Sequence, residues 1–176
     1  MKKITSIIAI GILSIAFSTT ASAQVSASAP TSTTIVTPIA ISNTIPMNFG
    51  NFATTPAIGT IVLKTDGGRT KTGGVTLPGK AGTVAAAKFK VDGQADYTYA
   101  VTMPTAELTL TLGLTANKMI VNAFNSTTLN NSGTLAGVLT LGTDTVSVGA
   151  TLNVGASQVA GLYENGTGFA VTVNYN

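Results

Sequence analysis

The chain has 176 residues, enough for one domain, and it contains no cysteine, histidine or tryptophan. These absences exclude disulfides, histidine-based catalysis and metal sites built on histidine or thiolate. Only 9% of the residues are charged, and without Lys2 and Lys3 the 7 basic side chains nearly balance the 6 acidic ones, which argues against nucleic acid as a partner.

Residues 1–23 have the composition of an export signal. Lys2 and Lys3 precede an interrupted apolar run over residues 4–17, and the small residues at 21–23 (ASA) match a cleavage site before Gln24. The run is too short for a membrane span. We therefore expect a signal peptide at 1–23, Sec-dependent export through the periplasm, and a final location at the cell surface or in an extracellular fibre.

Residues 24–34 predict a flexible N-terminal arm. Val25 is their one large apolar residue, although Val25, Ala27 and Ala29 keep a weak alternation. Ala, Ser and Thr at this density bury little surface. The same parity continues through Ile35, Ile39 and Ile41.

The rest of the chain, residues 35–176, predicts an all-β domain. Thr and Val are abundant, apolar positions alternate, and Gly, Asn, Asp and Pro break the pattern every 8–12 residues, as in a sandwich or barrel. We predict a hairpin that joins residues 84–91 to 97–103 through the Asp92-Gly93 turn. The strands are expected near residues 34–42, 47–49, 60–64, 74–77, 84–91, 97–103, 107–114, 118–124, 133–141, 145–148 with 151–154, 160–163 and 168–175.

The last expected strand places four large apolar side chains on one face: Phe169, Val171, Val173 and Tyr175. Something must cover that face. Two interpretations remain open. The segment is either the last strand of a complete sandwich or one wall of a groove that a neighbour fills.

Three stretches carry a family resemblance. They are residues 35–50, which include IVTPIAI and MNFG, residues 148–155 (VGATLNVG), and residues 161–175, which begin GLY and end GFAVTVNY. Together they resemble the DUF4402 family of exported bacterial proteins over nearly the whole chain after the signal. More distantly they are similar to spore coat protein U domains and to chaperone–usher pilins.

The resemblance implies an immunoglobulin-like antiparallel β-sandwich that lacks one strand. By that likeness Phe169, Val171, Val173 and Tyr175 line an assembly groove, and Val25, Ala27 and Ala29 form a donor strand for the next subunit. A periplasmic chaperone and an outer-membrane usher are the implied partners. Two features depart from the pilins: the cysteine pair is absent, and the arm's side chains are small, which favours Ile35, Ile39 and Ile41 as alternative donors.

From these features we expect a non-enzymatic structural subunit without cofactor or metal. We expect it to polymerise by β-strand addition, head to tail, with copies of itself or related subunits. The product is a fimbria-like or coat-like surface assembly that contributes to adhesion. The alternative is a self-complete secreted or cell-surface domain that binds glycan or an anionic surface through four basic loop residues. These are Lys64, Arg69, Lys71 and Lys80.

Overall fold

The computed structural model describes residues 24–130 and 135–176, so the expected signal peptide lies outside the described residues. The chain divides into two units, Met1–Thr34 and Ile35–Asn176, and each is described by itself. In the first unit, residues 24–34 form no helix or strand and their side chains are exposed. The second unit contains the strands.

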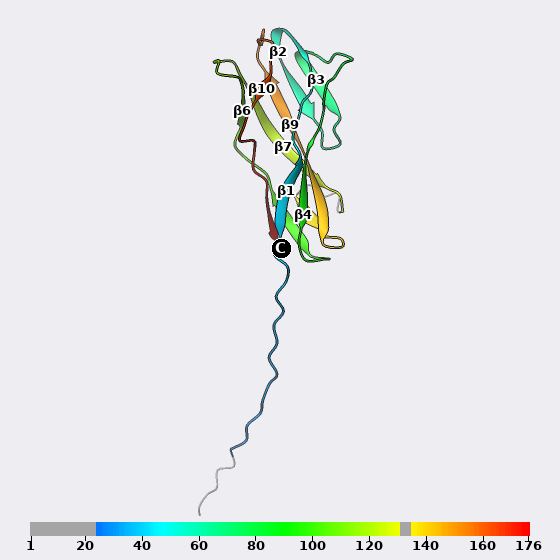
Figure 1. Ribbon diagram of the computed structural model, residues 1–176, viewed down its shortest axis with the longest axis vertical. Helices are drawn as coiled ribbons and strands as arrows, with labels where there is room; N and C mark the ends of the chain where they lie inside the picture. Colours follow the sequence, from blue (N-terminus) through cyan, green and yellow to red (C-terminus); the bar gives the residue numbers. More distant parts are fainter. Residues whose placement is uncertain (1–23, 131–134) are drawn as a thin grey trace, which may run out of the picture. The chain divides into compact units, whose positions relative to one another are not determined.

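All regular structure in the described residues is β-structure (Figure 1). The strands are β1 (Ala40–Ile45), β2 (Ala53–Leu63), β3 (Arg69–Thr76), β4 (Ala87–Asp92), β5 (Thr98–Thr102), β6 (Leu108–Leu112), β7 (Lys118–Thr128), β8 (Ala136–Val138), β9 (Thr143–Val154), β10 (Tyr163–Glu164) and β11 (Thr172–Tyr175). Between residues 24 and 176, apart from 131–134, no helix is long and apolar enough to cross a membrane.

Two antiparallel sheets form the domain. The larger has the order β1-β4-β9-β7-β6-β10, with β2 paired to β9 and β3 to β2, and the smaller has the order β11-β5-β8. The long strand β9 organises the larger sheet, because its first half pairs with β4 and its second half with β2 along the same edge. The predicted all-β antiparallel sandwich is confirmed.

Alternation explains the inward faces. In β4 the side chains of Ala87, Phe89 and Val91 are buried, while Lys88 and Lys90 point to solvent. At the junction of the two halves of β9 lies Gly149, where a Cβ atom would come within 2.3 Å of the carbonyl oxygen of Leu63. Glycine there lets β9 continue as one strand where the sequence pattern predicted two.

The predicted hairpin between residues 84–91 and 97–103 is wrong. β4 pairs with β1 and β9 in the large sheet, whereas β5 pairs with β11 and β8 in the small one. The turn at Asp92-Gly93 is therefore a corner between layers. Alternation fixes which face of a strand is buried, but it leaves the pairing partner open.

Strand β1 also begins later than predicted. Residues 34–39 are outside it, and its ladder with β4 starts at Ala40. Pro38 has no N–H to donate to a ladder, so a start after this residue is expected on physical grounds. Ile39 and Ile41 pack against the domain's own core, which argues against them as donor residues for a neighbour.

The core consists of two clusters, and only one of them lies between two sheets. The first joins β4 and β9 to β5 and β11 of the small sheet and to Leu139, which directly follows β8. The second lies on the other half of the large sheet, and none of its members comes from β5, β8 or β11. Its buried residues are Phe49, Ile61, Leu63, Val75, Met119, Val121, Ala150, Leu152 and Val154. The small sheet therefore covers only part of the large one.

A buried polar network joins the two layers. Asp144 on β9 is 2% exposed and accepts hydrogen bonds from the Tyr99 hydroxyl (2.9 Å) and from the backbone N–H groups of Asn130 (3.1 Å) and Thr145 (2.7 Å). Burial of Tyr99, then its hydrogen bond to Asp144 and the negative charge there, raise the pKa of the Tyr99 phenol well above its ordinary value. The hydroxyl therefore stays protonated and donates. The hydrogen bond between Tyr99 on β5 and Asp144 on β9 therefore links the small sheet to the large one.

Candidate functional site

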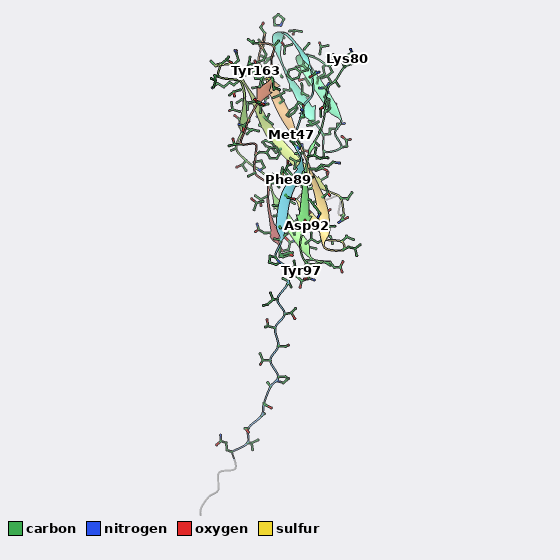
Figure 2. All side chains as sticks on the ribbon, viewed as in Figure 1. Met47, Lys80, Phe89, Asp92, Tyr97 and Tyr163 are labelled. Carbon is green, nitrogen blue, oxygen red and sulfur yellow. The ribbon has the colours of Figure 1, made fainter. Side chains whose placement is uncertain are left out.

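A groove of about 1120 Å³ runs along the large sheet, mostly over the half that the small sheet does not cover. Its floor is apolar and comes from four strands. The floor residues are Ala87 and Phe89 on β4, Leu108 and Leu110 on β6, Met119 and Val121 on β7, and Leu152 on β9. In Figure 2 the lining residues Tyr163, Met47 and Phe89 follow one another along the domain's long axis. We call this space the groove.

One wall of the groove is the segment that follows β1, residues 46–54. Asn48 exchanges backbone hydrogen bonds with Ala85 (2.8 and 2.9 Å), and the guanidinium of Arg69 donates to the carbonyl oxygen of Phe49. These bonds attach the wall to the body of the domain. Phe49 is thereby held buried against the groove floor.

The opposite wall is the segment that leads from β9 to β11, residues 158–169. The hydroxyl of Thr54 donates to the carbonyl of Gln158 (3.2 Å), which closes the groove between the two walls at one end. Leu162 and Val159 on this wall are 73% and 50% exposed. Large apolar side chains at the rim of an apolar groove indicate a surface that a partner covers.

Three strands have an edge without a partner within the described part of the chain, and two of them, β1 and β10, contribute residues to the groove lining. There β1 pairs only with β4, β10 only with β6, and β11 only with β5. The large sheet curls so that β1 and the last strand lie side by side near the C-terminus (Figure 1). No ladder joins these two strands. Unpaired backbone groups on facing edges can accept an added strand.

The four residues predicted for the last strand all face inward. Val171 and Val173 are buried in the first core cluster, and Phe169 and Tyr175 pack against it. Phe169 also lines the groove, where its ring lies 5.9 Å from that of Phe89 and 4.8 Å from that of Phe124, centre to centre. The regular strand is shorter than predicted, because residues 165–171 pass along the groove without a ladder partner.

Tyr175 fastens the chain where it enters the domain. Its hydroxyl donates to the carbonyl of Thr37 (2.7 Å) and accepts from the N–H of Gln94 (2.6 Å), and the Thr37 N–H donates to the Gln94 side chain (3.2 Å). The Tyr97 ring meets the Tyr175 ring edge to face at 5.6 Å. The penultimate tyrosine therefore anchors the root of the first strand.

Replacing Tyr175 with phenylalanine should lower the free energy of unfolding by about 1 kcal/mol, because the ring stays while two hydrogen bonds are lost. Hydrogen exchange at the Gln94 amide should accelerate in this variant. Chemical denaturation and exchange mass spectrometry measure both effects. Tyr97→Phe is the control, because the Tyr97 hydroxyl bonds to no described residue; equal effects of the two changes would contradict the assigned role.

The predicted donor residues lie in the first unit. Val25 is 89% exposed, and Ala27 and Ala29 are exposed too. Nothing within the described residues of that unit pairs with them as a strand. Their donor role stays a prediction.

The structure assigns different roles to the predicted basic residues. Arg69 is partly buried and holds the groove wall, whereas Lys64, Lys71 and Lys80 are exposed. Among the described residues the one ion pair joins Lys90 to Asp92 (2.8 Å), and no group of acidic, histidine or cysteine residues could hold a metal ion. Because Arg69 donates to the groove wall, three of the four predicted basic residues are left to form an anion-binding loop cluster.

Sequence reasoning missed two features. The first is Asp144, which lies outside the strands that the sequence predicts, because no sequence pattern identifies a single acidic residue as buried. The groove depends on the absence of cover over Leu108 and Leu110, whose alternation the sequence did reveal.

Comparison with known proteins gives one match. The model of a family described as a domain of unknown function, DUF4402, matches residues 39–175. No curated protein and no solved structure matches the chain.

Proposed function

This chain belongs to the DUF4402 family, and we propose that it is a non-catalytic structural subunit of a fimbria-like or coat-like surface assembly, joined to its neighbours by β-strand addition. The observation that carries the proposal is the groove. The small sheet does not reach the groove, whose floor residues Leu108 and Leu110 stay partly exposed and whose wall exposes Leu162 and Val159, while β1 and β10, which contribute to its lining, each have an unpaired edge. An added strand would satisfy both deficits at once.

The chemistry of the surface supports an assembly role. Large apolar groups at an open site are unstable as a free surface, whereas burial against a neighbour stabilises them. Insertion of a strand from one subunit into the groove of the next is a head-to-tail contact, which extends into a filament when the rotation does not close.

Export of such a subunit requires temporary cover. A periplasmic chaperone would supply it by occupying the groove until the neighbour's strand arrives, and an outer-membrane usher is the second partner of the proposal. The proposed route runs from the Sec pathway through the periplasm to the surface, where the assembly contributes to adhesion.

The test places a charge on the groove floor. Leu110→Lys should reduce the amount of the chain in high-molecular-mass material sheared from producing cells by tenfold or more, because burying an unpaired ammonium is costly. Immunoblotting after size-exclusion chromatography measures the distribution. Thr109→Lys, on the opposite face of the same strand, should leave it unchanged.

Circular dichroism must show that both variants are folded; Leu110→Ser substitutes if Leu110→Lys is not. A wild-type chain that is found only as a monomer, with an empty groove, would contradict the proposal. That outcome would favour the self-complete binding domain.

A further inference from the structure

We propose that the groove receives its strand from a different polypeptide, one with large alternating apolar side chains and a basic residue, and not from residues 24–34 of a second copy. The inference rests on the proposed function and names the occupant of the same groove. Three observations carry it: the size of the groove, its charge, and the composition of the chain's own arm.

The groove requires large side chains. About 1120 Å³ is lined by residues as large as Leu110, Met119 and Phe169. A small side chain placed opposite them leaves voids, and the lining atoms then lose their dispersion contacts. The best occupant therefore alternates leucine-sized residues inward with polar residues outward.

The arm of this chain does not meet that requirement. On one face of an extended strand its residues are Val25, Ala27, Ala29, Thr31 and Thr33, and on the other they are Gln24, Ser26, Ser28, Pro30, Ser32 and Thr34. Neither face offers more than one large apolar group. Pro30 would also remove one donor from the ladder.

The charge of the groove points the same way. Glu164 on β10 is the one formally charged residue of the lining, it is exposed, and within the described residues it forms no ion pair. A lysine or arginine on the incoming strand would complement it. Residues 24–34 contain no charged side chain, so after cleavage before Gln24 the one cation of the arm would be its terminal amino group and not a side chain within the strand.

The position in an assembly follows. A subunit in the middle of a head-to-tail chain must both accept and donate a strand. This chain accepts through the groove and has a poor donor, so it stands at one end of an assembly that other subunits extend.

The test measures the binding of three labelled peptides to the purified protein by fluorescence anisotropy. The first has the sequence of residues 24–34. The second is an 11-residue strand that alternates leucine or isoleucine with threonine and carries one lysine near the position of Glu164. The third replaces that lysine with glutamate. A shuffled form of the second, which breaks the alternation, controls for adhesion of an apolar peptide.

We expect the second peptide to bind at least tenfold more tightly than the first and the shuffled form. It should bind about twofold to fivefold more tightly than the third, a preference that Glu164→Gln removes. Leu110→Lys should weaken binding of the second peptide, and Thr109→Lys should not.

Each other outcome is decisive. If the arm peptide binds as tightly as the second peptide, the occupant is a second copy, and strand addition stands while this inference falls. If no peptide binds better than the shuffled form, strand addition itself fails, and the proposed function fails with it.

Discussion

Replacing Asp144 with alanine should lower the free energy of unfolding by about 2–3 kcal/mol, because the buried Tyr99 hydroxyl loses its acceptor, at a cost of about 1–3 kcal/mol, and two partly buried backbone donors lose theirs and bond to water instead. These donors are the Tyr99 hydroxyl and the N–H groups of Asn130 and Thr145. Since the network joins the two layers, the small sheet should loosen first. Urea denaturation and hydrogen exchange in β5 measure the two effects.

The matched control is Asp92→Ala. Asp92 also pairs with a partner, Lys90, but both side chains are about half exposed, and such pairs contribute about 1 kcal/mol or less. Tyr99→Phe removes one bond of the buried network and should cost less than Asp144→Ala, so it serves if the alanine variant fails to fold. Equal losses for the two aspartates would show that the buried network is not what joins the layers.

How far the sequence predicts the fold depends on whether a feature is local. The inward faces of β4 and of the segment that ends in β11 follow from alternation, since Phe89, Val91, Val171 and Val173 are buried as their spacing indicates. Pairing is not local. The Asp92-Gly93 turn has the chemistry of a hairpin, yet the strands on either side of it join different sheets.

The groove was predictable only in part. The last strand suggested an apolar face in need of cover, and Phe169 does line the groove. The groove floor on β6 and β7 consists of alternating apolar residues, and the same alternation occurs on any buried strand face. What distinguishes them is that no strand of the small sheet reaches them, and a missing layer leaves no mark in the residues beneath it.

The buried acid shows the same limit. Asp144 follows Gly142 and Thr143, a context typical of a turn, and aspartate is favoured in turns by its own hydrogen bonds. Its burial depends on Tyr99, which is 45 residues away in the sequence. Gly137 makes room for that ring, because a Cβ there would come within 2.3 Å of it. The sequence spacing of Asp144, Tyr99 and Gly137 therefore does not predict that they lie together.

A strand fused to the C-terminus should raise the melting temperature by about 8–16 °C. The fusion carries the leucine-rich, lysine-bearing strand on a Gly/Ser linker of about 12 residues after Asn176. Residues 168–175 of the last strand span about 26 Å, which such a linker covers at partial extension. If its effective concentration exceeds the dissociation constant about a thousandfold, the fold gains about 4 kcal/mol, and each kcal/mol raises the melting temperature by about 2–4 °C at this size.

Differential scanning calorimetry measures the shift, and a register control tests its cause. The control fusion shifts the strand by one residue relative to the same linker. If the end of the linker fixes the register, every leucine then points away from the groove floor, and the increase in melting temperature should fall to a small fraction of that of the first fusion. A fusion with the sequence of residues 24–34 should raise the melting temperature by less than a quarter of the full effect, since its side chains are too small to cover Leu108 and Leu110 on the floor. If all three fusions stabilise equally, the linker and not the groove is responsible, and the groove is then not an acceptor for an apolar strand.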